Sequence, residues 1–124
     1  MGVLNEHCPT RELLDLVADR WTVLVVLLLS ERPHRFADLR RRTTGISQRM
    51  LTVTLRRLER DGLVRRSVQP TKPPQVTYAL SELGGSLTEL VGSMRRWAED
   101  QATDVMEARK RFDRRTRARL ASPR

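Results

Sequence analysis

Side chains that can pair with the edges of nucleic-acid bases recur at helical spacing between residues 47 and 61. Leu51, Leu55 and Leu58 fall at positions i, i+4 and i+7 and form one apolar stripe. Arginine can pair with guanine through two hydrogen bonds, glutamine with adenine, and a threonine or valine methyl can touch thymine. The pattern predicts an amphipathic helix that reads the DNA major groove, and a solvated arginine face is the alternative for the helix alone. The face opposite the leucines carries Arg49, Thr52, Val53, Arg56 and Arg60, with Gln48 at its N-terminal edge.

Both ends of this predicted helix carry signals of their own. Ser47 suits the N-cap, because its hydroxyl can accept from the free N–H groups of the first turn. Gly62 follows the last turn, where a left-handed cap favours a residue without a Cβ atom. We therefore expect the helix to cover residues 47–61.

Further cations surround the helix and suit contacts with phosphates, which position a protein on DNA without specifying sequence. Residues 40–42 and Arg60 are expected to meet phosphates, and Arg66 and Lys72 to reach the backbone or the adjacent minor groove from a hairpin. The predicted DNA-binding residues are Arg40, Ser47, Gln48, Arg49, Thr52, Val53, Arg56, Arg66 and Lys72.

Positive charge is concentrated in two parts of the chain. The 124 residues carry a net charge of +9. Residues 35–66 hold ten arginines against three acids, and residues 109–124 hold eight cations against Asp113, so each segment has a net charge of +7. Such concentration favours a polyanionic partner. Of the 24 cations 22 are arginine, which suits bidentate contacts but also fits a GC-rich coding sequence.

Three helices are expected before the reading helix. Residues 9–17 form the first, with Pro9 at an early position where its missing N–H costs little. Asp19 is expected to cap a second, nearly all-apolar helix that ends near residue 30 and lies centrally in the fold. Residues 32–36 are a candidate edge strand, residues 36–42 a third helix, and residues 43–46 a turn from which Ile46 enters the core.

A hairpin and a long helix are expected after the reading helix. Residues 63–68 and 75–80 pair as a wing around a proline-rich turn. One long helix then begins at residues 81–82 and keeps large apolar residues beyond the length that a small domain can cover. We therefore expect a homodimer, with interface residues Leu4, Leu13, Trp97, Val105 and Met106.

The predicted fold is a mainly α-helical winged helix-turn-helix with a small β-hairpin wing and a long C-terminal dimerisation helix. One domain is expected over residues 1–108, followed by an arginine-rich tail over residues 109–124. Two half-sites of a dimer would require an operator that is an inverted repeat.

The sequence shows no clear pattern of residues for catalysis or metal binding. His7 and His34 are the two histidines and have no second ligand at metal spacing, so we expect no metal site. No phosphate-binding loop and no catalytic set is evident, so we expect neither an enzyme nor a cofactor. No export signal is recognised, the apolar run 21–29 is too short for a membrane span, and a single cysteine allows no internal disulfide. A cytoplasmic protein without a membrane partner is expected.

A series of landmarks follows one order along the chain: Cys8-Pro9, Asp19-Arg20-Trp21-Thr22, Arg35-Phe36 with Leu39, Gly45-Ile46-Ser47-Gln48 with Met50-Leu51, the stretch 58–64 and the stretch 78–84. With these landmarks the sequence resembles the HxlR family of bacterial transcription regulators, relatives of the MarR type, over about residues 8–100. The resemblance implies a homodimeric winged-helix DNA binder that controls nearby genes, often in response to electrophiles, aldehydes or oxidants. The sequence departs from the family at residues 19–20, where Gly-Lys is common, and after about residue 108.

Cys8 matches the family position at which several members sense oxidants. It lies at the start of the first predicted helix, where free N–H groups stabilise a thiolate. Arg11 adds to this effect, and Glu6 and Glu12 oppose it. Two roles of Cys8 stay open: it is either a redox or electrophile switch, or a cysteine that only packs.

Two rival functions stay open. An RNA-binding module would also use arginine, but it more often shows exposed aromatic residues for base stacking, and this chain has five aromatic residues, most at apolar positions. The second rival is a protein that chiefly senses a small molecule, an electrophile or a redox change and binds DNA secondarily. It would differ from the leading prediction only in what lies at Cys8 and between the helices. The leading prediction is a repressor or autoregulator that binds DNA.

Overall fold

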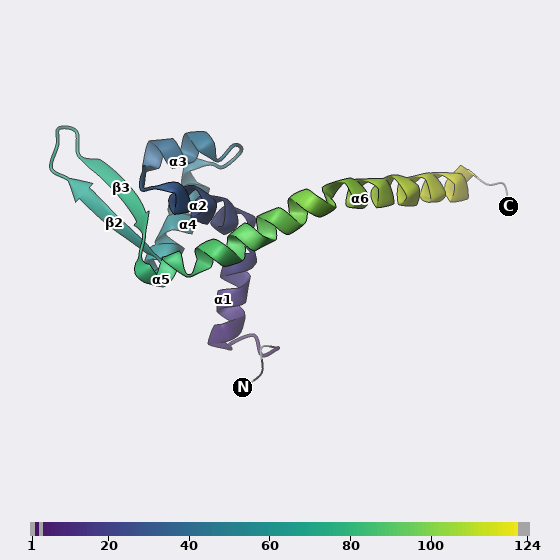
Figure 1. Ribbon diagram of the computed structural model, residues 1–124, viewed down its shortest axis with the longest axis horizontal. Helices are drawn as coiled ribbons and strands as arrows, with labels where there is room; N and C mark the ends of the chain where they lie inside the picture. Colours follow the sequence, from purple (N-terminus) through teal and green to yellow (C-terminus); the bar gives the residue numbers. More distant parts are fainter. Residues whose placement is uncertain (1, 3, 122–124) are drawn as a thin grey trace. The chain divides into compact units, whose positions relative to one another are not determined.

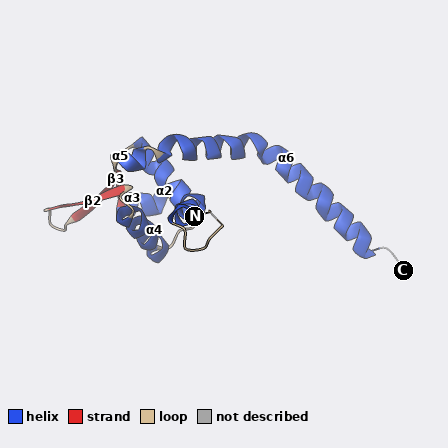
Figure 2. Cartoon of the chain, turned by 90° about the horizontal axis from the view of Figure 1, so that it is seen from below, coloured by secondary structure: helices blue, strands red, loops and turns tan. Residues whose placement is uncertain are grey.

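The computed structural model describes residues 2 and 4–121, and two compact units lie within the chain, Met1–Val91 and Gly92–Arg124. The first unit combines helices with a three-stranded sheet, and the second is helical (Figures 1 and 2). The elements are, in order, α1 (Pro9–Ala18), α2 (Arg20–Glu31), β1 (His34–Arg35), α3 (Phe36–Arg42), α4 (Gln48–Arg60), β2 (Val64–Gln69), β3 (Gln75–Leu80), α5 (Glu82–Gly85) and α6 (Leu87–Ala121).

The helix boundaries predicted from local signals are confirmed. Pro9 begins α1, and the Asp19 carboxylate caps α2 by accepting from the backbone N–H of Trp21 at 2.9 Å. Gly45 and Gly62 adopt φ values of +91° and +75° in the turns before and after α4. These conformations are easy for glycine and strained for residues with a Cβ atom, which is why both turns contain it.

The sheet is antiparallel, in the order β1-β3-β2. Strands β2 and β3 form the predicted hairpin, which extends away from α2, α3 and α4 in both views (Figures 1 and 2). Strand β1 pairs with the other edge of β3, with His34 opposite Tyr78, as expected for a short edge strand. The wing is thereby attached to the segment that leads into α3.

One hydrophobic core lies inside the first unit. Helix α2 is central, because Val25, Val26 and Leu29 are buried, and Val91 is buried at the start of α6. Ile46 enters this core as predicted. The core cluster comprises Leu16, Val25, Val26, Leu29, Leu39, Ile46, Leu51, Leu55, Leu58, Leu63, Val64, Tyr78 and Val91.

The expectation of one uninterrupted helix from residue 81 is wrong. The chain forms a short α5 and then a separate α6, with Ser86 between them. Ser81 Oγ caps α5 by accepting from Gly84 N at 3.0 Å, and it donates to the Gly62 carbonyl at 2.5 Å. These contacts fix α5 against the start of the wing. A Cβ atom on Gly84 would lie 1.9 Å from the Leu63 carbonyl oxygen, so the contact requires glycine.

The second unit is the continuation of α6, which runs without interruption to Ala121. The residues predicted as an arginine-rich tail are therefore helical as far as Ala121, and residues 122–124 of that tail lie outside the described residues. The domain boundary at residue 108 stays a prediction.

Candidate nucleic-acid interface

Helix α4 is held so that one face is buried and the other faces solvent. Ser47 Oγ accepts from Met50 N at 3.0 Å, which confirms the predicted N-cap. Leu51, Leu55 and Leu58 are at most 1% exposed. Burial of this apolar stripe fixes the rotation of the helix about its axis, so the residues opposite the stripe must be presented outward.

The outward face carries the predicted base-reading side chains. Gln48, Arg49 and Arg56 are exposed, and Val53 is 41% exposed. Thr52 is half-buried, and its hydroxyl donates to the Gln48 carbonyl at 2.9 Å. Because that hydrogen is already used, Thr52 can offer its methyl group and an acceptor oxygen. The face therefore combines donors, acceptors and methyl groups, as reading of base edges requires.

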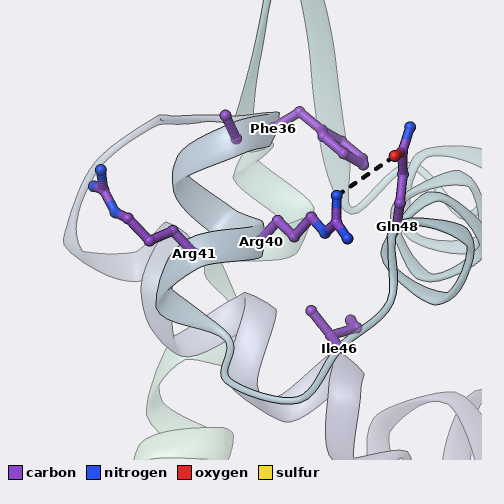
Figure 3. Close-up of a pocket in the computed structure, with 6 residues that line it drawn as sticks. Phe36, Arg40, Arg41, Ile46 and Gln48 are labelled. Atoms are coloured by element: carbon purple, nitrogen blue, oxygen red, sulfur yellow. Dashed lines mark hydrogen bonds between the residues drawn. The ribbon is translucent and has the colours of Figure 1, made fainter.

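An open hollow between α3 and the start of α4 brings Arg40 beside Gln48 (Figure 3). Arg40 Nη1 lies 3.5 Å from Gln48 Oε1, at the outer limit of a hydrogen bond. Phe36 and Ile46 line the apolar part of the hollow. A cation is thus placed at the N-terminal edge of α4, where it suits a phosphate beside the predicted base contact of Gln48.

The three arginines of α3 are not equivalent. Arg41 is paired with Asp38 at 3.1 Å, and Arg42 with Glu31 at 2.6 Å. Within the described part of the chain, Arg40 is the one that forms no ion pair. Arg41 points away from Gln48 in Figure 3. The expected phosphate contacts of residues 40–42 thus have their strongest support at Arg40.

A second hollow lies between α4 and the wing. It is lined by Thr52, Arg56, Glu59, Arg66 and Tyr78. The hollow joins Arg56 from the helix and Arg66 from β2, which are ten residues apart in the sequence. Two guanidinium groups at one hollow suit a phosphate oxygen, because arginine can donate two hydrogen bonds to one such group.

Two lining residues of this hollow were absent from the sequence prediction. Tyr78 is buried opposite Arg66 in the β2–β3 register. Glu59 lies three residues after Arg56 and places an acid among the cations. The spacing could have indicated Glu59, whereas Tyr78 reaches the hollow only through strand pairing.

The remaining cations lie apart from these hollows. Lys72 is exposed in the loop that joins β2 and β3. Arg57 and Arg60 line a hollow with Glu12 and Leu16, next to α1. Lys72 is therefore available at the wing tip, whereas Arg60, which was predicted to meet a phosphate, lies beside an acid of α1.

Cys8 is the N-cap residue of α1 and is 4% exposed. Hydrogen bonding from the backbone N–H of Arg11 lowers the pKa of the thiol, and hydrogen bonds from Thr10 act in the same direction. Burial and the charge of Glu12 oppose this effect on the pKa. The site therefore combines a thiol of lowered pKa with little access for reagents.

The residues predicted for a dimer interface are all exposed. Leu4 and Leu13 belong to the first unit, and Trp97, Val105 and Met106 belong to the second. Trp97 is 65% exposed. Each unit therefore offers large apolar side chains to solvent.

The described residues offer neither a metal site nor a membrane-spanning helix. Across residues 2 and 4–121, no group of three His, Cys, Asp or Glu side chains is arranged to hold a metal ion. In the same part of the chain, no helix combines the length and the apolar composition that crossing a membrane requires.

Comparison with known proteins places this geometry among transcriptional regulators. A family model described as HxlR-like helix-turn-helix matches residues 16–106. The HTH-type transcriptional regulator YtfH of Escherichia coli (strain K12) is 42% identical over 108 residues, which cover 87% of this chain and 86% of YtfH.

Solved structures extend the comparison. The structure of ytfH from Salmonella typhimurium has a TM-score of 0.83 and 38% identity, covering 88% of this chain and 97% of that protein. The redox regulator HypR in its reduced form has a TM-score of 0.73 and 38% identity, covering 82% of this chain and 99% of HypR.

Proposed function

Because the chain belongs to the HxlR-like helix-turn-helix family and is a DNA-binding transcriptional regulator, we propose that it acts as a homodimer on an inverted-repeat operator. The observation that carries this proposal is the outward face of α4, with Gln48, Arg49 and Arg56 exposed beside the β2–β3 wing. An α-helix fits the major groove, and residues near its N-terminus meet base edges.

In the proposed complex each side chain has a role set by its chemistry. Arg49 pairs with guanine O6 and N7, and Gln48 pairs with adenine. Thr52 and Val53 contact thymine methyl groups. The proposed phosphate contacts come from Arg40 beside α4 and from Arg56 and Arg66 at the hollow between α4 and the wing. Ser47 holds the first turn of α4, and Lys72 reaches the backbone or minor groove from the wing tip.

The proposed dimer follows from exposed apolar residues of the second unit. Met94, Trp97, Val105 and Phe112 share one face of α6 by their spacing and are all exposed. A lone helix leaves such a stripe in water, which favours association with a second copy. Leu4 and Leu13 of the first unit and Met106 of α6 extend the proposed interface. Two reading helices would then meet half-sites about 34 Å apart.

The proposed regulation is repression or autoregulation, relieved by an electrophile, an oxidant or a small ligand. HypR is described as a redox regulator in oxidised and reduced forms, which supports this class of inducer. Cys8 is the proposed sensor because its pKa is lowered at the start of α1.

Footprinting on the promoters of the chain's own gene neighbourhood tests the operator, and sedimentation velocity at micromolar concentration tests the assembly. We expect protection of two half-sites centred about 10 base pairs apart, and a dimer. Protection of a single half-site, or a monomer, would contradict the homodimer.

A further inference from the structure

The last part of α6 carries a basic surface that the family does not account for. The family match ends at residue 106, and α6 continues to Ala121. Residues 109–121 hold seven cations against Asp113, all of them exposed. Among the described residues, none of these cations forms an ion pair, since the last pair along the chain joins Arg95 and Glu99.

The cations are not spread evenly around the helix. Lys110, Arg114 and Arg117 follow one another at positions i, i+4 and i+7, so they share one face. We call these three residues the basic stripe. With a rise of 1.5 Å per residue, it is about 10 Å long. Phe112 lies on the opposite face, in line with Val105. The stripe therefore faces away from the apolar row of Met94, Trp97, Val105 and Phe112, whereas Met106 lies one turn before Lys110 on the side of the stripe.

Among the described residues, Lys110, Arg114 and Arg117 form no ion pair, and Glu107 and Asp113 are the acids within four residues of them in α6. Like charges four residues apart destabilise a helix, although cations near a helix C-terminus interact favourably with its dipole. An anion with regularly repeated charges would relieve the repulsion along the whole stripe. Duplex DNA offers one charge per about 1.7 Å of its axis, so a stripe of this length can meet several phosphates.

We propose that the basic stripe of Lys110, Arg114 and Arg117 is a second, sequence-independent phosphate-binding surface for duplex DNA. The inference rests on the proposed function, because that function brings the chain to DNA. It adds a surface on the second unit to the reading face on the first. Arginine and lysine there would strengthen binding to any sequence and would not change which bases are preferred.

Composition favours nucleic acid over an anionic membrane as the partner. A helix that lies on a membrane buries a broad apolar face. Between residues 109 and 121, Phe112 and Leu120 are the large apolar residues, against seven cations. Charge, rather than apolar area, therefore dominates the chemistry of this segment.

The test compares two full-length triple variants with the wild type. One replaces the stripe (Lys110→Gln, Arg114→Gln and Arg117→Gln). The matched control removes three charges from other positions of the same segment (Arg109→Gln, Arg115→Gln and Arg119→Gln). Fluorescence anisotropy with an operator duplex and a scrambled duplex, over a range of salt concentrations, gives the slope of log affinity against log salt. Circular dichroism checks that both variants keep the helix.

We expect the stripe variant to reduce the slope by up to about 2.7 per chain, at about 0.9 for each lost phosphate contact. We expect the same reduction of the slope for both duplexes. For the control variant we expect the slope to fall by less than about 0.9, the value of one phosphate contact. An unchanged slope, or equal losses in the two variants, would overturn the inference. Intact DNA binding combined with lost binding to phosphatidylserine vesicles would overturn it in favour of a membrane.

Failure of the proposed function gives a different result. If the wild type itself binds neither duplex at any salt concentration, the DNA-binding proposal falls together with the stripe. If the wild type binds and only the slope of the stripe variant stays unchanged, the inference about the stripe falls alone.

Discussion

Arg42 and Glu31 form an ion pair of 2.6 Å that joins the last residue of α3 to the last residue of α2. The same Arg42 Nη1 lies 2.8 Å from His34 Nε2. Because arginine can only donate, His34 accepts there, and its Nδ1 carries the hydrogen that is donated to the Arg32 carbonyl at 2.8 Å. One guanidinium thus connects two helices and the edge strand β1 that supports the wing.

We expect this pair to stabilise the fold in a pH-dependent way. Hydrogen bonding from Arg42 lowers the pKa of Glu31 below its ordinary value of 4.5, with the charges of Arg42 and Arg32 acting in the same direction and burial opposing them. A carboxylate whose pKa is lower in the folded state stabilises the fold above the unfolded value, and the effect is lost as the pH falls through the folded value. We therefore expect the contribution to be present at neutral pH and to decline as the pH falls below about 4.5.

We expect Glu31→Gln to lower the free energy of unfolding at pH 7 and to match the wild type more closely as the pH falls below 4.5. Urea unfolding at a series of pH values measures the difference. Glu107→Gln is the control, because Glu107 is exposed and forms no ion pair within the described residues. A Glu31→Gln effect of constant size across this pH range would show that the pair contributes nothing.

The contact between α5 and the wing predicts opposite effects for two adjacent glycines. Gly84→Ala would place a Cβ atom 1.9 Å from the Leu63 carbonyl oxygen. Because that oxygen belongs to the backbone and accepts from Ser81 N, the chain must shift, at a cost of about 1–3 kcal/mol. Gly85→Ala meets nothing within 4 Å, and we expect it to stabilise the fold by about 0.4–1 kcal/mol. Thermal or urea unfolding of both variants measures the change in the free energy of unfolding. Equal changes in the two variants would contradict the close contact at Gly84.

These two glycines also show why the last helix was mispredicted. The caps at Asp19 and Ser47 and the turn at Gly62 depend on neighbours in the sequence, and local signals located them correctly. The break at Ser86 follows α5, which is held against the Leu63 carbonyl, a contact between segments about twenty residues apart. Periodicity cannot show such an approach, so it extended one helix across the break.

The part of the candidate interface that depends on the orientation of α4 alone could be predicted from the sequence. The exposure of Gln48, Arg49 and Arg56 follows from burial of the leucine stripe. The ion pair of Arg41 with Asp38 is a local contact within α3, three residues apart, whereas the pair of Arg42 with Glu31 depends on where α2 lies in the folded chain. A run of three arginines therefore looked uniform in the sequence and is not uniform in the structure.

Arg49 should contribute to both affinity and base preference. We expect Arg49→Ala to weaken operator binding by about 1–3 kcal/mol and to relax the preference at one base pair, because a bidentate contact with guanine is lost. Affinity measurements on an operator and its single-base variants give both quantities. Arg57→Ala removes the same charge from the side of α4 next to α1 and is the control. Equal losses from the two variants would mean that Arg49 acts only through its charge.

Lys72 should act without sequence preference. We expect Lys72→Ala to lower affinity for operator and scrambled duplexes by the same factor and to reduce the salt slope by about 0.9. Its side chain is exposed in the loop of the wing, where a phosphate or the minor groove is accessible. Salt titrations of both duplexes, again with Arg57→Ala as the control, measure the change. A loss confined to the operator would assign Lys72 to base reading instead.

The proposed redox control through Cys8 depends on access to a buried thiol. Its thiol has a pKa below the ordinary value of 9.0, with the backbone N–H of Arg11 as the largest cause, yet it is 4% exposed. The thiolate is the reactive form, so alkylation by iodoacetamide should reach half its maximal rate below pH 9.0, at a pace limited by exposure.

Oxidation of Cys8 should lower the affinity for DNA. As the one cysteine of the chain, Cys8 can form an intersubunit disulfide, a mixed disulfide or a sulfenic acid, and each adds bulk at the buried start of α1. We expect diamide to weaken operator binding by the wild type about 5- to 150-fold, the usual range for coupled sites, and to leave Cys8→Ser unchanged. Anisotropy before and after diamide, followed by reduction with dithiothreitol, measures the effect and its reversal. If both proteins respond alike, or neither responds, Cys8 only packs, and the inducer must bind elsewhere.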